Sequence, residues 1–217
     1  MSSSRTVKTA LASKLRDDIV RGSFEPGARL RLEQLAKRYD VSTMPIREAI
    51  SVLESEGIVV TIPHKGALVT KLSSDELREI YEIRANLEKM ATLKAVPRMN
   101  VSVLEDLEQL IAQMDDAGTD SARFSELNTK FHNCLYACSG KEHLSSLIQS
   151  LRHRTQHYLH AYIDNEERFQ NAQKEHRKLL ELCKLGEAEK AGELMIQHVY
   201  KVGLSIANVV ELEEVVV

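Results

Sequence analysis

The sequence has few cysteines and lacks a long apolar run. Its three cysteines, Cys134, Cys138 and Cys183, are an odd number without CxxC spacing, and no secretory leader is recognisable before them. This pattern argues against a disulfide framework and predicts a reducing, cytoplasmic compartment. No apolar stretch approaches the roughly 18 residues that a transmembrane helix requires, so we expect no membrane span.

Strand patterns are also missing from residue 73 onward, where helical spacing is nearly continuous. A capping box is predicted at the start of this part, with Ser73 or Ser74 as the cap and Glu76 three residues beyond Ser73. The apolar spacing predicts helices at 73–96, 101–116, 120–138, 142–163, 166–185 and 187–209, with Pro97 after the first. Long amphipathic helices joined by short loops are typical of an antiparallel all-α bundle.

Residues 1–72 have a different pattern. Three helical segments are followed by two β-branched runs, IVVTIP and GALVT, which are separated by HKG. This order within about 70 residues predicts a winged helix-turn-helix. We therefore expect a mainly α chain, in which a winged-helix domain at 1–72 precedes an all-α domain of about six helices at 73–217.

The charge is distributed unevenly between these two parts. Residues 1–72 contain 12 Lys and Arg against 8 Asp and Glu, which gives a net charge of +4. Because the whole chain has a net charge of −3, the remaining residues have a net charge of −7. A basic first part joined to an acidic second part indicates an anionic partner for the first only.

The stretch VSTMPIREAI contains a proline in a segment with helical spacing. Pro45 would cost about 3 kcal/mol in a helix interior, but it is tolerated in a first turn, where no backbone hydrogen bond is lost. If Ser42 caps this helix, Ser42, Thr43 and Arg47 face outward at its N-terminal end. In helix-turn-helix proteins that end enters the major groove of DNA.

Further basic residues flank this helix. Each one taken singly is more often a solvated surface charge, but their joint placement fits the neutralisation of DNA phosphates. Gly66 permits a tight turn at the tip of the predicted hairpin. Besides the three helix residues, the candidate DNA contacts are Arg31, Arg38, His64, Lys65 and Gly66.

The segment RLEQLAKRYDVSTMPIREAISVLESEGIVVTIPHKGALVT resembles the winged-helix domain of GntR-family transcription regulators, in the FadR-like branch. EIYEIRANLE, LNTKFHNCLYACSG, EHRKLLE and MIQHVY resemble the signatures of that branch's ligand-binding FCD domain. Thr43 stands where many members have an arginine. The resemblance implies a DNA-binding regulator, and the reading of two operator half-sites implies a homodimer.

Four residues of the second part are candidate metal ligands. Asn128 and His132 are four apart on one helix, whereas His176 and His198 belong to the last two helices. A single histidine on an amphipathic helix is usually a surface or hydrogen-bonded core residue. The resemblance implies that all four bind a divalent metal, zinc or else nickel. Asn128 replaces the more usual aspartate, which removes a negative charge and should weaken the binding.

The sequence leaves the roles of two charged residues, Arg84 and Glu175, undecided. The resemblance places Arg84 near the cavity, where it could pair with a small carboxylate effector, but Glu88 one turn later could equally hold it in a structural salt bridge. Glu175 adjoins His176 in sequence and should point away from it on a helix, so no convincing general base lies beside the candidate ligands.

The leading functional hypothesis is a ligand-responsive transcription regulator, a repressor that binds operator DNA and is not an enzyme. Two alternatives remain open. Histidine-rich helical bundles can activate water, so a metalloenzyme is the first. A protein–protein adaptor that uses the winged helix as a scaffold is the second.

Overall fold

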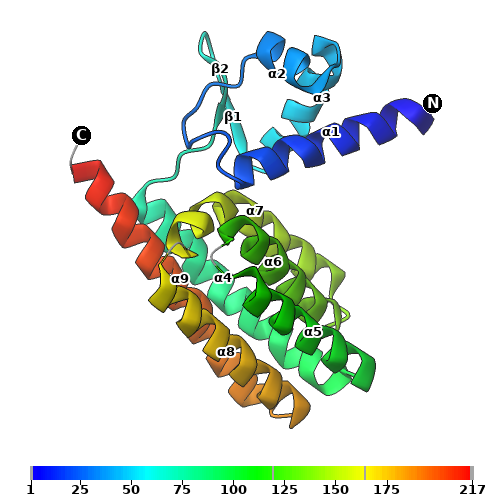
Figure 1. Cartoon of the computed structure of the whole chain (residues 1–217), viewed down its shortest axis with the longest axis vertical. Coiled ribbons are helices and arrows are strands. Elements are labelled where there is room, and N and C mark those ends of the chain that lie inside the picture. Colours follow the sequence, from blue (N-terminus) through cyan, green and yellow to red (C-terminus); the bar gives the residue numbers. More distant parts are fainter. Residues whose placement is uncertain (1, 119, 164, 216–217) are drawn as a thin grey trace. The chain divides into compact units, whose positions relative to one another are not determined.

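The computed structural model describes residues 2–118, 120–163 and 165–215, and the chain divides into two compact units, Met1–Leu72 and Ser73–Val217. In the first unit, three helices precede a two-stranded hairpin (Figure 1). The elements are α1 (Ser2–Val20), α2 (Leu32–Tyr39), α3 (Thr43–Ser55), β1 (Val59–Ile62) and β2 (Gly66–Val69). This order confirms the predicted winged helix-turn-helix.

An apolar core joins α1 to α3. Leu15 and Ile19 of α1 and Leu53 of α3 are fully buried in it, because their spacing places them on the inner face of each helix. Arg16 of α1 also donates to both carboxylate oxygens of Glu56, at 2.6 to 2.9 Å. These contacts hold the C-terminal part of α3 and leave its first turn at the surface.

The hairpin ends in a strained turn. β1 and β2 pair antiparallel with Ile62 opposite Gly66, and the backbone N–H of Lys65 donates to the carbonyl oxygen of Ile62 at 3.1 Å. His64 has a φ of 63°, in the left-handed region, which costs a residue with a Cβ about 1–2 kcal/mol. His64 and Lys65 are both exposed. The strain therefore lies at His64, a residue that was predicted to meet DNA.

The second unit is all α in its described residues, which confirms the predicted bundle. Its helices are α4 (Ser74–Ala95), α5 (Val101–Ala117), α6 (Ser121–Ala137), α7 (Glu142–Ile163), α8 (Glu166–Lys184) and α9 (Ala188–Val215). The prediction ended the last helix at 209, which is too early. The additional turns pack on the bundle, because Val210 is buried and Glu211 pairs with Arg78 of α4. No described helix combines the length and apolarity that a membrane crossing needs.

Both ends of α4 follow the sequence signals. The Ser73 hydroxyl accepts from the backbone N–H of Glu76 at 3.3 Å, and the Glu76 carboxylate accepts from the backbone N–H of Ser73 at 2.9 Å. The hydrogen bond from the Ser73 backbone lowers the pKa of Glu76 below its ordinary value. At the other end, Pro97 lies in a short 3-10 helix, Val96–Arg98, that follows α4. The predicted capping box is confirmed.

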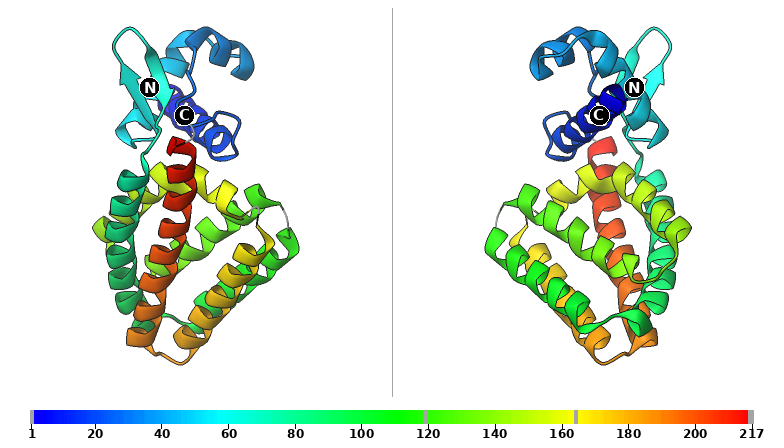
Figure 2. Two further views of the ribbon diagram at one scale, coloured as in Figure 1. Left: turned by 90° about the vertical axis from the view of Figure 1, so that its left-hand side faces the viewer. Right: turned by 90° about the vertical axis from the view of Figure 1, so that its right-hand side faces the viewer.

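Helices α4 and α9 run side by side, as the views in Figures 1 and 2 show. Gly203 of α9 is buried against α4. A Cβ at this position would overlap with the side chain of Tyr81 on α4. Tyr81 also lines the pocket described below, so this contact links the packing of the bundle to the site.

Replacing Gly203 by alanine is expected to destabilise the second unit by about 1–3 kcal/mol, because the added methyl group overpacks a close helix contact. Urea denaturation followed by circular dichroism measures the loss. Ser205→Ala, on the same helix and half-buried, serves as the control and should change stability by less than about 0.5 kcal/mol. A Gly203→Ala variant as stable as the wild type would contradict the close packing.

Candidate functional site

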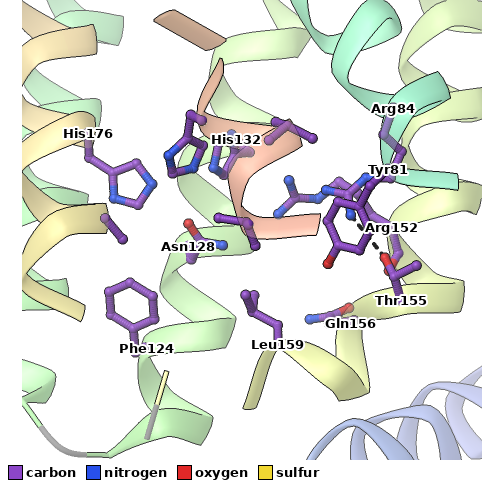
Figure 3. Close-up of a pocket in the computed structure, with 14 residues that line it drawn as sticks. Tyr81, Arg84, Phe124, Asn128, His132, Arg152, Thr155, Gln156, Leu159 and His176 are labelled. Atoms are coloured by element: carbon purple, nitrogen blue, oxygen red, sulfur yellow. Dashed lines mark hydrogen bonds between the residues drawn. The ribbon is translucent and has the colours of Figure 1, made fainter. Parts of the chain in front are cut away.

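Three histidines from three helices converge inside the second unit. His132 lies on α6, His176 on α8 and His198 on α9, and their exposed fractions are 1%, 1% and 8%. Their ring centroids are 5.0 to 5.6 Å apart, and each ring offers one nitrogen within 4.8 Å of the others. Figure 3 shows the rings of His132 and His176 at one side of a pocket. Zinc and nickel bind such groups of imidazoles in proteins.

The side chain of Gln173 orients His176. Its amide nitrogen donates to the carbonyl oxygen of Ile111 (3.3 Å) and to Oδ1 of Asp115 (2.7 Å), so its oxygen faces His176. Nδ1 of His176 lies 3.0 Å from that oxygen and must carry the proton, because an amide oxygen only accepts. The other ring nitrogen, Nε2, is buried without a hydrogen-bond partner among the described residues. An unsatisfied buried polar atom costs about 1–3 kcal/mol, and a metal ion would satisfy it.

Glu175 orients His198 in the same way. Its Oε2 lies 2.6 Å from Nδ1 of His198, and its Oε1 accepts from Lys201 at 3.1 Å. Burial alone would raise the pKa of Glu175, but the hydrogen bonds from His198 and Lys201 and the charge of Lys201 hold it below its ordinary value. The ionised carboxylate accepts a hydrogen bond from Nδ1–H, which leaves Nε2 of His198 for a ligand. Sequence reasoning considered Glu175 only beside His176 and did not place it against α9.

His132 is held by a tyrosine one turn later on α6. Its Nδ1 lies 2.9 Å from the hydroxyl oxygen of Tyr136, and the Tyr136 hydroxyl donates a hydrogen bond to Oε2 of Glu88 on α4. Glu88 is fully buried, which alone would raise its pKa, but the charges of Arg84 and Arg152 hold the pKa below its ordinary value. Because the tyrosine proton is committed to Glu88, the tyrosine oxygen accepts from His132. His132 therefore also keeps Nε2 for a ligand.

Two of the three imidazoles, His132 and His176, are held in the neutral form that metal binding requires. Burial lowers the pKa of His132 and of His176 well below the ordinary value, and the charge of Arg152 lowers both further. Metal ions bind neutral imidazole, and a hydrogen bond from the remote ring nitrogen is its usual support. The orphaned nitrogen of His176 and these supporting bonds show that the residues present fit a divalent metal ion.

Asn128 lies beside the histidine cluster. It stands one turn before His132 on α6, is buried and lines the same pocket. Figure 3 shows its carboxamide between the histidines and Phe124. The structure thus brings together the four residues that were predicted as metal ligands, of which Asn128 offers an uncharged oxygen.

The other side of the pocket is cationic (Figure 3). Arg84 of α4 donates to Oε1 of Glu88 at 3.0 Å and to the hydroxyl of Thr155 at 2.9 Å, so the structural salt bridge considered from the sequence is present. Nη1 of Arg152, on α7, lies 3.6 Å from Oε2 of Glu88, which is longer than a hydrogen bond. One carboxylate faces two buried guanidinium groups, so this part of the pocket carries one positive charge that Glu88 does not neutralise.

In the first unit, the N-terminal turn of α3 is exposed. Ser42 occupies the N-cap position with an extended backbone, but its side chain makes no capping hydrogen bond. The predicted cap is thus confirmed in position only, and the hydroxyl remains available to another partner. Thr43 and Arg47 are exposed, while Ile46 between them is fully buried in the core. Pro45 lies in the first turn of the helix, where the sequence placed it.

Arginines line a hollow between α3 and the hairpin. Arg29, Arg31 and Arg47 contribute to it together with Gly66. The backbone of Arg29 also forms an isolated antiparallel bridge with Leu68, which the sequence pattern did not predict. Its guanidinium group lies 3.8 Å from the point where a Cβ on Gly66 would stand. The hairpin is therefore joined to the segment before α2, and basic side chains gather beside the exposed end of α3.

Arg38 has a structural role. It forms an ion pair with Asp18 of α1 at 2.9 Å and lies over the ring of Phe24 at 5.1 Å from its centroid. The neighbouring Tyr39 donates its hydroxyl proton to the same carboxylate at 2.6 Å. These contacts tie α2 to α1. A contact of Arg38 with DNA stays a prediction.

Sequence reasoning missed the residues that support the histidines. Tyr136 follows His132 by one helical turn and Gln173 precedes His176 by three residues, so helical spacing was the one available signal for both. Arg152 gave no such signal, because its position in the pocket depends on how α7 packs against α4 and α6.

Two family descriptions match the chain. The description "Bacterial regulatory proteins, gntR family" matches residues 7–69, and "FCD domain" matches residues 79–201, which is more than half of the chain. The regulator YdhC of Bacillus subtilis is 30% identical over 86% of this chain and 84% of its own length. The transcriptional repressor GlaR of Escherichia coli is 28% identical over 85% of this chain and 88% of its own length.

The fold is shared with solved structures. Escherichia coli McbR has a TM-score of 0.81 at 23% identity, covering 96% of this chain and 98% of its own. A GntR regulator from Rhodococcus has a TM-score of 0.80 at 22% identity, covering 93% and 97%. The matched families and relatives are transcription regulators and not enzymes. This chain belongs to the GntR family, in its FadR-like branch with an FCD domain, and is a DNA-binding transcription regulator.

Proposed function

We propose that this regulator responds to a small carboxylate that binds beside a divalent metal ion in its FCD domain. The observation that carries the proposal is the buried, unpartnered Nε2 of His176 within a cluster of three imidazoles. His132, His176 and His198 would hold the ion, with Asn128 as a fourth ligand. Zinc is the preferred ion for this donor set, and nickel is the alternative. When bound, the ion supplies a positive centre for carboxylate oxygens.

The cationic side of the pocket supports a carboxylate as the effector. Arg152 and Arg84 both line it, and one of their two positive charges is not neutralised by Glu88. Arg84 is already bonded to Glu88 and Thr155, so Arg152 is the better placed to receive an anion. A guanidinium–carboxylate hydrogen bond is among the stronger polar contacts in proteins.

DNA binding is assigned to the winged-helix domain at 1–72, and effector binding and dimerisation to the domain at 73–217. The exposed start of α3 would enter the major groove, and the hairpin tip would follow the neighbouring backbone. The proposed DNA contacts are Arg31, Arg38, Ser42, Thr43, Arg47, His64, Lys65 and Gly66. A homodimer would read two half-sites, and we assign it the role of a repressor, which is the described role of its relative GlaR.

Regulation would follow from linkage between the two ligands. A carboxylate that prefers one arrangement of the dimer changes the affinity for DNA by the ratio of its affinities for the two arrangements. Titrating zinc-loaded protein against its own upstream DNA, with and without a carboxylate that raises its melting temperature, tests the proposal. Equal DNA affinities under both conditions would rule out a ligand-responsive regulator.

Replacing Arg152 by glutamine is expected to weaken carboxylate binding about 10- to 100-fold, because a hydrogen bond to a charged group contributes about 1.5–3 kcal/mol. A panel of mono-, di- and hydroxycarboxylates in a thermal-shift assay provides the ligand, since a ligand of the folded state raises its stability. Arg154→Gln removes the same charge from α7 outside the pocket lining and is the control. Equal melting shifts in wild type and Arg152→Gln would contradict the assignment.

A further inference from the structure

A continuous line of buried contacts connects the cationic side of the pocket with the histidine cluster. Nη1 of Arg152 lies 3.6 Å from Oε2 of Glu88. Oε2 of Glu88 also accepts a hydrogen bond from the Tyr136 hydroxyl. The hydroxyl oxygen of Tyr136 lies 2.9 Å from Nδ1 of His132. Arg152, Glu88, Tyr136 and His132 are exposed by no more than 7%, so water does not screen these contacts.

We propose that Tyr136 and Glu88 are positioning residues that transmit the state of Arg152 to His132 and so couple anion binding to metal affinity. This inference rests on the proposed function, because it requires that the histidine cluster binds a metal ion. It adds two residues on α6 and α4 that touch neither ligand.

The sign of the coupling between anion binding and metal binding follows from the atom that Arg152 and Tyr136 share, which is Oε2 of Glu88. Oε2 of Glu88 interacts with both Arg152 and Tyr136, whereas Oε1 is held by Arg84. When an anion pairs with Arg152, the guanidinium group attracts Oε2 of Glu88 less. Oε2 then accepts the hydrogen bond from the Tyr136 hydroxyl more strongly and polarises that hydroxyl. The tyrosine oxygen then accepts more strongly from Nδ1–H of His132, and Nε2 becomes a better electron donor. Anion binding should therefore tighten metal binding, and metal should tighten anion binding by the same factor.

The first test is the Tyr136→Phe variant, which removes one hydroxyl and leaves every proposed metal ligand in place. We expect its zinc affinity to fall about 10- to 100-fold, the usual effect of losing a group that supports a metal-bound histidine. Nitrogen NMR of the metal-free protein should also show that His132 no longer keeps its proton on Nδ1 alone. Tyr200→Phe, at an exposed position on α9, is the control and should match the wild type in both measurements.

A double-mutant cycle tests the transmission itself. Arg152→Met removes the charge from Oε2 of Glu88 without adding a hydrogen-bonding group, so it stands in for an occupied anion site. We expect it to raise zinc affinity about 2- to 10-fold in the wild-type background and to leave it unchanged in the Tyr136→Phe background. Equal gains in both backgrounds would mean that the charge acts directly through space, which overturns the relay.

The outcomes separate this inference from the proposed function. A wild-type protein that binds no zinc would overturn both. Zinc binding that is lost in His176→Ala but unchanged in Tyr136→Phe would keep the metal site and overturn the relay. Melting curves of the variants identify any that fail to fold, and the His132 tautomer of folded Tyr136→Phe then decides the question independently of zinc affinity.

Discussion

His176→Ala is expected to weaken the binding of the proposed metal ion by several hundred-fold. A protein site for zinc stabilises the ion by about 10–16 kcal/mol in total, so one of four ligands accounts for about 3–4 kcal/mol and its loss weakens binding by several hundred-fold. The effect should be especially clear at His176, because its Nε2 is buried and has no partner among the described residues. Zinc at a given concentration should raise the melting temperature of the wild type by more than that of the variant.

Elemental analysis and zinc titration measure this loss, on protein that was never exposed to a nickel column. His143→Ala is the matched control, since His143 lies outside the pocket lining and should retain the wild-type metal content. Retention of one metal ion per chain with unchanged affinity in His176→Ala would show that the cluster is a buried polar network and not a metal site.

Arg47→Glu is expected to weaken specific DNA binding strongly. Arg47 is exposed at the N-terminal end of α3 and has no ion-pair or hydrogen-bond partner among the described residues. A bidentate contact with guanine contributes about 1–3 kcal/mol, and the proposed homodimer would lose it twice, so affinity should fall between about 30-fold and 20,000-fold. The introduced carboxylates also repel the DNA phosphates, which strengthens the loss at low salt.

Fluorescence anisotropy with the protein's own upstream DNA, at several salt concentrations, measures this effect. Arg21→Glu makes the same charge change at an exposed position just after α1 and is the control for net charge. If Arg47→Glu and the wild type bound that DNA equally, α3 would not be the reading element. Such a result would favour the protein–protein adaptor considered from the sequence.

Local patterns were sufficient for the elements of the fold. Leu15 and Ile19 stand four residues apart, a spacing that places both on one helix face, and Ser73 with Glu76 predicted a capping box. Both signals arise within one or two helical turns. The hairpin was predicted from β-branched runs around a glycine. The end of α9 was predicted too early, because its last turns are held by contacts with α4 that no local pattern contains.

The candidate ligands were identified in the sequence by family resemblance, and their supporting residues were not identified. His132, His176 and His198 stand in three helices, so periodicity could place each on a helix face but could not show that the three faces meet. Glu175 illustrates the limit. Reasoning along α8 directed its side chain away from His176, and the same orientation brings it to His198, 23 positions further along the chain.

The sequence alone determined the order of the elements, the exposed start of α3 and the residue types available for metal and DNA. Each of these depends on interactions between residues that are near in the chain, where spacing implies proximity. Tertiary packing decided which nitrogen of each histidine is available and that Glu88 is shared between Arg152 and Tyr136. It also decided that Arg38 pairs with Asp18. These contacts join different helices, and their geometry depends on how side chains from both fill one buried space.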